Sequence, residues 1–508
     1  MKKENVFIAL GIGMMLVACP MESPKEKVAI PVISYSEGVI ENGGLKFISD
    51  YQEVSITCET GGATIYYTTD GTTPTKDSLI LGENETILMG PGKIQAFAAK
   101  SGYVDSDITS ATFAEIEFTL PGGGTLSFAE RPWTRFLGGP GEDYVNDMVI
   151  DSQGNLYLTG RTASNLGGQT IQGQSDVFVA KYSSTGNLQW VKLRGGIKYE
   201  DGLALAVDTS GNVYVTGYTN NSFDNNPFQG AYDLFLMKFT GEGTHQWTKF
   251  YGGSGTEAGR ALALQGNQWV YVGGQAPSES GGTHSHLLLQ YRPDGSLYGG
   301  YTTGNVGPMD QIQGIALSAQ DLYALRQSEG TLSIRRCPLD NINNQLYTIQ
   351  LNYFYGSGIA VDASNNVYIV GYTTQALDDQ TAKGGRDIFI IKYSSSLVSK
   401  WSRIVGGPQD DYGTKITLAG DYLYVAGYTK SSFNGQTPTG DFDSFVMKYD
   451  LNGNHIWTKF IGSESTEGGF GVGVDTSGNV YLAGNTIGSF DGQTNKGNYD
   501  IFLRKHVP

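Results

Sequence analysis

The sequence predicts an all-β protein whose main part, residues 125–508, is a seven-bladed β-propeller with four strands per blade. A unit of about 50–57 residues recurs along this part, and its clearest copies begin at Trp133, Trp190, Trp247, Trp401 and Trp457. Each unit contains four short phrases rich in β-branched and aromatic residues, which favour strands. Four strand-like phrases at a period of about 50 residues are typical of propeller blades.

The second and third phrases of the unit each occur seven times, which sets the expected number of blades. Copies of the second phrase, such as Val-Tyr-Val-Thr-Gly, stand at 156–160, 213–217, 270–274, 322–326, 367–371, 423–427 and 480–484. The third phrase, as at 233–239, alternates at a period of two, as expected of a strand. The first phrase is small and apolar, as at 471–474, and we expect it where the inner strands crowd around the axis.

One fourth phrase is displaced, and its position predicts how the ring closes. Residues 131–136 carry a fourth phrase before the first unit, while the last third phrase, 500–506, is followed by none. We therefore expect residues 131–137 to form the outermost strand of the blade built by 468–506. This pairing would remove the unpaired edge that an open array exposes.

The turns between the first and second phrases predict tight hairpins. They read Asp-x-x-Gly-Asn or Asp-x-x-Asn-Asn at 151–155, 208–212, 362–366 and 475–479. Asp and Asn cap such turns, and Gly supplies a positive φ angle. Each turn offers a single carboxylate, whereas a calcium loop needs several oxygens from one segment.

With these turns and the Val-Tyr-Val-Thr-Gly runs that follow them, residues from about 130 to 508 resemble the bacterial β-propeller repeats called SBBP repeats. The resemblance implies a β-propeller. Two units depart from the pattern, because Tyr298 and Tyr347 stand where Trp is expected and Ala324-Leu325-Arg326 replaces the Thr-Gly ending. These departures leave the blade boundaries open in the third and fourth units.

The N-terminus predicts a lipoprotein signal peptide over residues 1–18. A basic start is followed by an apolar stretch, 6–18, that is too short to span a membrane as a helix. Leu16-Val17-Ala18 before Cys19 resembles the lipobox of bacterial lipoproteins, which implies lipid attachment at Cys19. Such an anchor would hold the protein at the cell envelope, in the outer membrane. The alternative is an ordinary secretory signal that contains a cysteine.

Residues 19–28 are expected to be a charged tether, and a separate β-domain follows over 29–119. The strand-like run 63–69 leads into an Asp-Gly turn at 70–71, and a second apolar run spans 92–103. Together these segments resemble the Ig-like module at the C-terminus of chitobiases and hexosaminidases. That resemblance implies a β-sandwich of seven or eight strands without catalytic residues. Residues 120–124 are then a short hinge into the propeller.

Charge and motif content exclude several functions. The chain carries a net charge of −16 and a pI of about 4.8, which argues against nucleic acid as a partner. None of its five histidines lies in a known catalytic or metal-binding motif, and no nucleotide-binding glycine motif is present. We expect no enzymatic activity, no cofactor and no metal site.

One group of acidic residues is a candidate ligand face. In a propeller, the connections that enter the first strands share a face with the long loops between second and third strands. The entering connections contribute six acidic candidates: Asp143, Asp201, Glu257, Asp310, Asp411 and Glu467. The third phrase also begins with Asp in five units, as at Asp176 and Asp233. A repeated Asp is better explained by hydrogen bonds to the N–H groups of a turn than by ligand binding.

These observations predict a lipid-anchored envelope protein whose propeller binds a macromolecular partner, either a protein or a glycan, through its variable loops. Two alternatives stay open. The sandwich and the tryptophans also suit a protein that binds glycans or assists their processing, although we expect the tryptophans to pack between blades. A passive surface-coat role is the other alternative.

Overall fold

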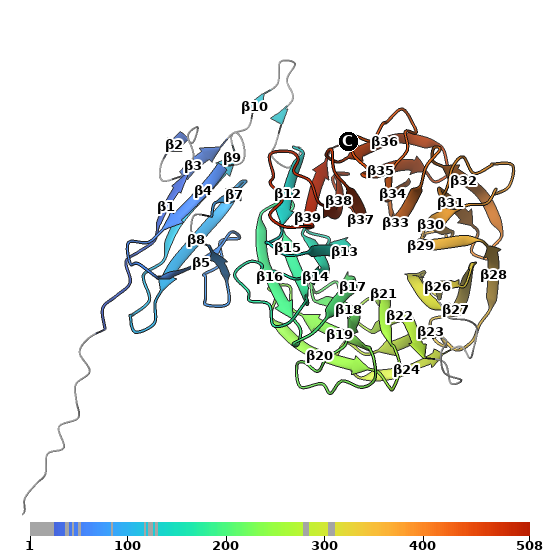
Figure 1. Cartoon of the computed structure of the whole chain (residues 1–508), viewed down its shortest axis with the longest axis horizontal. Helices are drawn as coiled ribbons and strands as arrows, with labels where there is room; N and C mark the ends of the chain where they lie inside the picture. The colour runs from blue at the N-terminus through green and yellow to red at the C-terminus, as the bar shows by residue number, and fades with distance from the viewer. Residues whose placement is uncertain are drawn as a thin grey trace, which may run out of the picture.

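The computed structural model describes residues 25–35, 40–42, 45–48, 52–82, 85–115, 118–119, 125–126, 131–277, 284–302 and 310–507. Every regular element in these ranges is a β-strand (Figure 1). Within them, no helix has the length and apolar character needed to cross a membrane. The predicted signal peptide and Cys19 lie outside the described residues.

The N-terminal domain is a sandwich of two sheets. One sheet has the order β1-β4-β7, and the other has the order β2-β3-β9-β8-β5-β6. The strands are β1 (Val32–Tyr35), β2 (Ile40–Asn42), β3 (Leu45–Ile48), β4 (Gln52–Thr57), β5 (Thr64–Thr68), β6 (Leu79–Leu81), β7 (Ile87–Met89), β8 (Gly92–Ala99) and β9 (Thr109–Glu115). The described part therefore has nine strands rather than the seven or eight expected. The number is higher because part of the domain is divided into short strands of three or four residues.

The core of the sandwich forms from alternate residues of facing strands. Val54 and Ile56 of β4 point inward and are almost fully buried, together with Met89, Ile94 and Phe113. This period of two is the pattern expected of strands that bury one face. After the sandwich, β10 (Phe118–Thr119) pairs with β11 (Thr125–Leu126) on either side of the segment expected to be a hinge.

The rest of the described chain forms seven four-stranded antiparallel sheets, numbered here in chain order. Sheets 1–3 contain β13 (Asp143–Ile150), β14 (Leu156–Thr162), β15 (Asp176–Tyr182) and β16 (Leu188–Arg194); β17 (Glu200–Val207), β18 (Val213–Thr219), β19 (Asp233–Phe239) and β20 (His245–Tyr251); and β21 (Ala258–Gln265), β22 (Trp269–Pro277), β23 (His284–Tyr291) and β24 (Leu297–Thr302). Each of the four phrases predicted in a unit forms one strand of a sheet.

Sheets 4–6 contain β25 (Gln311–Leu317), β26 (Asp321–Ser328), β27 (Thr331–Pro338) and β28 (Tyr347–Asn352); β29 (Phe354–Val361), β30 (Val367–Thr373), β31 (Asp387–Tyr393) and β32 (Ser399–Val405); and β33 (Asp411–Ala419), β34 (Tyr422–Thr429), β35 (Asp443–Asp450) and β36 (His455–Ile461). Sheet 7 contains β37 (Glu467–Val474), β38 (Val480–Thr486), β39 (Asp500–His506) and, from far upstream, β12 (Trp133–Leu137).

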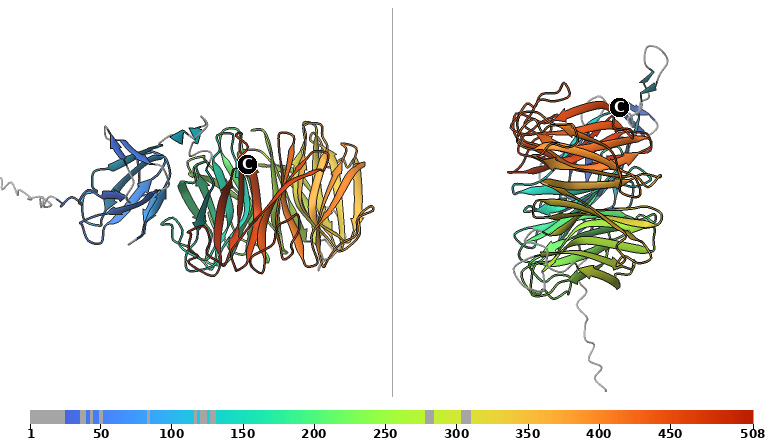
Figure 2. Two further views of the ribbon diagram at one scale, coloured as in Figure 1. Left: turned by 90° about the horizontal axis from the view of Figure 1, so that it is seen from above. Right: turned by 90° about the vertical axis from the view of Figure 1, so that its right-hand side faces the viewer.

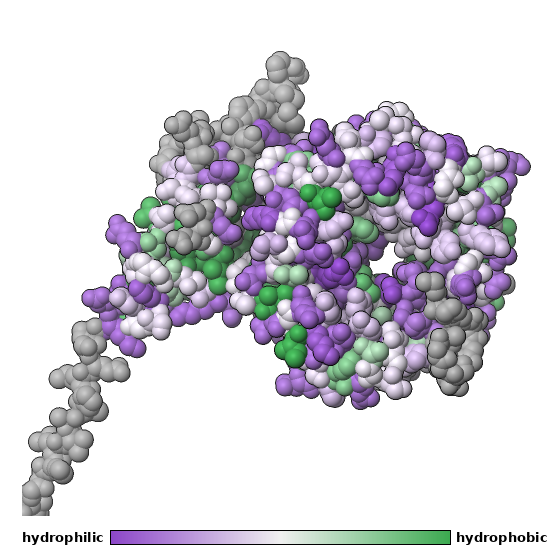
Figure 3. Space-filling view, in the orientation of Figure 1, coloured by the Kyte–Doolittle hydropathy of each residue, from purple (hydrophilic) through white to green (hydrophobic). Residues whose placement is uncertain are grey.

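The sheets stand around a common centre in a propeller-like arrangement (Figures 1 and 2). The first strand of each sheet lies beside the first strand of the next, and β37 lies beside β13. The space-filling view shows the ring hollowed at its centre (Figure 3). Strand β12 pairs antiparallel with β39, from Trp133 opposite Lys505 to Leu137 opposite Ile501, which is the partner expected for residues 131–137.

The repeated tryptophan packs between neighbouring sheets, as expected. The indole N–H of Trp190 in sheet 1 donates to the carbonyl of Gly241, in a turn of sheet 2, at 3.0 Å. Trp401 makes the same bond to Leu451 of the next sheet at 3.1 Å. Their large apolar surfaces therefore contribute to the contacts between neighbouring sheets.

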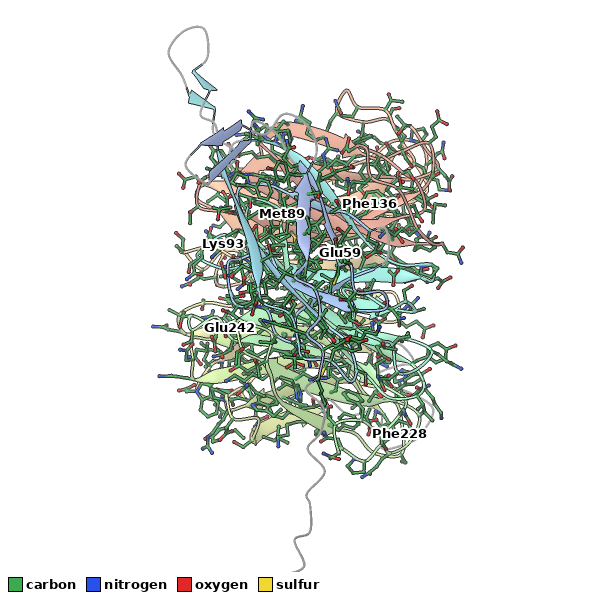
Figure 4. All side chains as sticks on the ribbon, turned by 90° about the vertical axis from the view of Figure 1, so that its left-hand side faces the viewer. Glu59, Met89, Lys93, Phe136, Phe228 and Glu242 are labelled. Atoms are coloured by element: carbon green, nitrogen blue, oxygen red, sulfur yellow. The ribbon has the colours of Figure 1, made fainter. Side chains whose placement is uncertain are left out.

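The sandwich contacts sheet 1 along its outermost strand, β16 (Figure 4, which looks onto the sandwich with Met89 and Lys93 labelled). The side chain of Asn187 accepts from the N–H of Gly90 at 3.0 Å and donates to the carbonyl of Pro91 at 3.3 Å. Thr69 donates to the carbonyl of Leu188 at 2.7 Å. Buried residues of both parts belong to one hydrophobic cluster, so the two domains share packed surface.

Candidate functional site

The face predicted to carry the ligand is defined by two kinds of connection. We call it the loop-bearing face: it holds the segments that enter each first strand and the loops between second and third strands. The N–H of Glu200 donates to the carbonyl of Ser175 in the preceding sheet at 3.0 Å, and Glu257 bonds Tyr232 in the same way at 2.8 Å. The two kinds of connection therefore do lie at one face of the ring.

The six acidic candidates on this face are buried rather than displayed. The side chains of Asp143, Asp310, Asp411 and Glu467 have no exposed surface, and Glu257 and Asp201 are 3% and 6% exposed. Burial raises the pKa values of Asp143 and Asp310. It raises the pKa of Asp411 to about 6 and the pKa values of Asp201 and Glu257 to about 7. Ligand binding by these six residues stays a prediction, and their burial points to a structural role.

Three of these acids hold the strand ends together by the same contacts. Asp143 accepts from the N–H of Gly139 at 2.8 Å and from the Thr162 hydroxyl. Glu467 accepts from the N–H of Ser463 at 2.7 Å and from the Thr486 hydroxyl at 2.8 Å. Asp411 repeats the pattern with Gly407 and Thr429. Each carboxylate thus joins a connecting loop to the second strand of its sheet.

Asp201 differs from the other candidates, because its neighbour Glu200 occupies the repeated position. Glu200 accepts from Gly196 and from Thr219, both at 2.9 Å. Asp201 instead accepts from the Asn146 side chain at 2.6 Å and lies 3.6 Å from a guanidinium nitrogen of Arg161. Asp201 therefore links sheets 1 and 2. The sequence pattern did not distinguish the role of Asp201 from that of Glu200.

The aspartate that begins the third strand in five of the seven sheets caps the loop before it, as expected from its repetition. One carboxylate oxygen accepts from the N–H four residues upstream; for Asp176 the donor is Gln172 at 2.9 Å, and for Asp233 it is Gln229 at 3.0 Å. The same bond recurs at Asp387, Asp443 and Asp500.

At the sheet junctions these aspartates meet the entering acids across a glycine. A Cβ on Gly195 would lie 2.7 Å from Oδ1 of Asp176 and 2.5 Å from Oε2 of Glu200, so both oxygens face the same Cα. In the next junction, Asp233 Oδ1 and Glu257 Oε2 are buried and accept no hydrogen bond from the described residues. Burial, and then the charge of Asp233, raise the pKa of Glu257 to about 7, so the pair favours holding a proton.

An aromatic cluster that was not predicted from the sequence lies on the loop-bearing face. We call it the aromatic arc; it spans sheets 5–7 and consists of Tyr355, Tyr372, Tyr412, Tyr428, Phe442 and Phe470. Neighbouring ring centroids are 5.0 Å apart for Tyr355 and Tyr372, 5.0 Å for Tyr372 and Tyr412, and 4.8 Å for Tyr412 and Tyr428. The available signal was a Tyr after the entering acid, as in Asp411-Tyr412, and a Tyr after the Thr/Ala-Gly ending, as in Gly427-Tyr428.

The opposite face of the ring is made of tight turns that satisfy their own polar groups. Oδ1 of Asp151 accepts from the N–H groups of Gln153 and Asn155, both at 2.9 Å, and Oδ2 accepts from the Asn155 side chain. The turns at 208–212, 362–366 and 475–479 repeat these bonds. Within the described ranges, no group of three or more His, Cys, Asp or Glu side chains is arranged to hold a metal ion.

A cleft of about 790 Å³ lies between the sandwich and sheets 1 and 2. Its walls are mainly polar and carry both signs of charge, with Asp70 and Asp77 from the sandwich and Lys192, Arg194 and Glu242 from the propeller. The Lys192 ammonium group already donates to the Asp77 carbonyl at 2.9 Å. The cleft therefore follows from how the two domains meet.

His284 and His286, which lie two residues apart in β23, differ in burial. His286 is 1% exposed, and burial together with the nearby Arg326 guanidinium lowers its pKa to about 3. Its Nδ1 lies 2.8 Å from Arg326 Nη2. His286 therefore stays neutral at the junction of sheets 3 and 4, where Arg326 occupies the position of the usual glycine.

Among solved structures, the chain is similar to the WD40 domain of Neurospora crassa Pan2, with 12% identity and a TM-score of 0.41 over 72% of this chain and 89% of that chain. It is also similar to the WD40 β-propeller domain of Doa1, with 10% identity and a TM-score of 0.42 over 73% and 95%.

Two curated relatives match at the level of sequence. A regulatory protein, FlaEY, of Caulobacter vibrioides is 26% identical over 71% of this chain and 38% of its own length. An uncharacterized WD repeat-containing protein of Acanthamoeba polyphaga mimivirus is 23% identical over 62% of this chain and 26% of its own length. The chain thus spans well under half the length of either relative.

Two family models match separate parts of the chain. Residues 43–110 match the chitobiase/β-hexosaminidase C-terminal domain, within the sandwich. Residues 133–167, 189–224, 345–376 and 456–491 match the SBBP β-propeller repeat. The first matched repeat begins at Trp133 in β12, so the family's repeat starts with the outer strand of one sheet and continues into the next sheet. The chain therefore carries SBBP β-propeller repeats behind a chitobiase/β-hexosaminidase C-terminal-type domain.

Proposed function

We propose that this β-propeller repeat protein is a lipid-anchored binding protein of the cell envelope, attached at Cys19 to the outer membrane. The sandwich acts as a stalk, and the propeller is a closed ring of seven blades. The loop-bearing face of the ring binds a macromolecular partner. The proposal includes no catalytic step.

Closure of the ring is supported by strand pairing and by neighbour contacts. Strand β12 supplies the outer strand of sheet 7, and β37 of that sheet lies beside β13 of sheet 1. Each of the seven sheets then has four strands, and a closed ring leaves short, protected edges. A rigid scaffold of this kind suits binding through loops.

The observation that carries the binding role is the contrast between the two faces. The turns of the opposite face bind their own polar groups, as Asp151 does. The loop-bearing face has longer connections, and Tyr355 and Arg386 are exposed on it. Half-exposed aromatic rings and charged groups with exposed surface are available to a partner.

The membrane anchor is supported by the sequence alone. The lipobox-like residues 16–18 precede Cys19, and residues 20–28 connect this point to the sandwich. A protein displayed in this way would reach a partner outside the membrane surface, which agrees with a binding role.

A blocking experiment tests which face binds. In a Cys58→Ala background, we introduce Thr437→Cys on the loop-bearing face or Ser477→Cys on the opposite face, and attach a polyethylene glycol maleimide. Both positions are exposed, Cys337 is buried and unreactive, and Cys19 carries the proposed lipid. Binding is measured on arrays of glycans and extracellular-matrix proteins with the full-length protein.

The proposal expects the modified Thr437→Cys protein to lose binding and the modified Ser477→Cys protein to keep it. Equal loss from both, or loss from the Ser477→Cys protein alone, contradicts the assignment of the loop-bearing face. Turnover of a glycan substrate that persists through purification would contradict the absence of catalysis.

A further inference from the structure

The aromatic arc is not required by the propeller repeat. Tyr355 lies in the first strand of sheet 5. The equivalent position is occupied by Ala258 in sheet 3, Gln311 in sheet 4 and Gly468 in sheet 7. The position of Tyr372 is likewise held by Gln275 in sheet 3. Sheets 1 and 2 carry aromatic pairs on this face, Tyr144 with Tyr499 and Tyr218 with Tyr232. Because the fold also accepts small and polar residues at these positions, the repeat does not require the longer run of six rings in sheets 5–7.

The arc offers ring surface to a ligand. Tyr355 is 38% exposed and stacks on Tyr372 with 9° between the ring planes. The other rings of the arc are partly exposed, unlike Phe389 and Phe445 deeper in the same sheets, which have no exposed surface. Because the planes of Tyr372 and Tyr412 differ by 72°, the rings offer separate stacking surfaces along an elongated ligand.

The charges around the arc are paired with one another. An Arg386 guanidinium nitrogen lies 3.4 Å from an Asp410 carboxylate oxygen, and the Lys430 ammonium lies 2.9 Å from Asp441. Arg386 also lies over Tyr372 and Tyr412, with 5.8 and 5.5 Å to their centroids. Although the whole chain carries −16, these two ion pairs add no net charge to the surroundings of the arc. The arc therefore suits a neutral ligand that offers both hydrogen-bond donors and acceptors.

The rim beside the arc is hollowed where sheets 5 and 6 meet. A cleft of about 390 Å³ is lined by Lys383, Pro408 and Ser432 from connections of the loop-bearing face, and by Ile404 and Val405 at the end of β32. Lys383 and Pro408 are close in sequence to Arg386 and Asp410, so the cleft adjoins the charged end of the arc. An elongated ligand could extend from the rings into this hollow.

We infer that the aromatic arc binds a neutral glycan chain, whose sugar rings stack on the tyrosines while their hydroxyl groups bond Arg386 and Asp410. A pyranose ring combines an apolar C–H face with hydroxyls at its edge, which matches rings flanked by a guanidinium and a carboxylate. This inference rests on the proposed role of the loop-bearing face, and it names the chemistry of the partner.

The test measures binding of the full-length protein to a neutral glycan array, followed by calorimetry with neutral β-1,4-linked glucose and N-acetylglucosamine hexamers. A heparin hexamer and a proline-rich peptide are the competing probes. Tyr355→Ala should weaken glycan binding on the order of fivefold, because it removes one aromatic stacking contact. Tyr355→Phe keeps the ring and should retain binding. Tyr422→Ala is the matched control, because Tyr422 is 39% exposed but lies on the opposite face.

Three results would overturn the inference: no neutral glycan binds, Tyr355→Ala and Tyr422→Ala affect binding equally, or only heparin or the peptide depends on Tyr355. In the last case the proposed function stands and the ligand chemistry is wrong. If glycan binding depends on Tyr355 but is blocked only from the opposite face, the placement of the proposed docking surface fails instead.

Discussion

Trp133 lies against Tyr481, with ring centroids 5.9 Å apart, although the two residues come from opposite ends of the propeller sequence. The other sheets repeat this contact locally: Tyr157 with Trp190 and Tyr214 with Trp247, each at 6.2 Å. Trp133 therefore occupies in sheet 7 the place that Trp190 and Trp247 occupy in sheets 1 and 2. Its indole N–H also donates to the Ser184 carbonyl of sheet 1, at 3.4 Å, so it connects the first and last sheets.

We predict that Trp133→Ala destabilises the propeller as much as Trp190→Ala does, by about 3–5 kcal/mol each, because both side chains are buried between sheets. Denaturant unfolding monitored by circular dichroism measures the change. Deletion of residues 125–137 should cost more, since it exposes the edge of β39. A propeller that unfolds at the same denaturant concentration after either change would show that β12 does not close it.

Two turn glycines provide a second prediction, because only one of them lies against a tryptophan. Gly243 has φ of 81°, and a Cβ there would lie 2.9 Å from the Trp190 ring. Gly211 has φ of 82° but open space around it. Gly211→Ala should therefore cost only the backbone strain, about 1–2 kcal/mol, whereas Gly243→Ala should cost clearly more because it also displaces the indole. Equal losses of unfolding free energy would show that the tryptophan is not tightly packed.

The buried acids predict that stability falls as pH rises. Burial raises the pKa of Glu200 and of Glu257 from 4.5 to about 7, so the folded state binds protons more tightly than the unfolded state between these values. Their contribution is present below pH of about 4.5 and is lost as pH rises through 7. The urea midpoint should therefore be lower at pH 8 than at pH 5.

Glu257→Gln should reduce this pH dependence and raise stability at pH 8, because it removes a charge that faces Asp233. Glu464→Gln, at an exposed position, is the control and should leave the pH profile unchanged. If wild type and Glu257→Gln show the same difference between pH 5 and pH 8, these acids do not titrate in this range.

Lipidation is tested at Cys19, which lies outside the described residues. Cys19→Ser should abolish metabolic labelling by a palmitate analogue and release the protein from the membrane fraction, because one residue would carry the entire acyl anchor. Continued labelling of the variant would refute the assignment of residues 1–18 as a lipoprotein signal peptide.

The connection between β34 and β35 is one of the long loops expected to carry binding, but it also contributes to the core of sheet 6. The structure places Tyr428 and Thr429 in β34, and Phe433 is 8% exposed and packs on Phe445 and Phe460. Replacing the whole loop would open the core of sheet 6, so single exposed positions such as Thr437 are the better probes.

The strands, the repeat and the strand partner of residues 131–137 could be predicted from sequence, because each follows from local periodicity and from counting repeated phrases. Burial of Asp143 and Glu467, the choice of Glu200 over Asp201, and the aromatic arc could not. They depend on which side chains from different sheets face one another, as Tyr372 of sheet 5 faces Tyr412 of sheet 6. A one-residue difference in position moves a strand side chain to the other side of its sheet, and only the packed ring decides what it meets there.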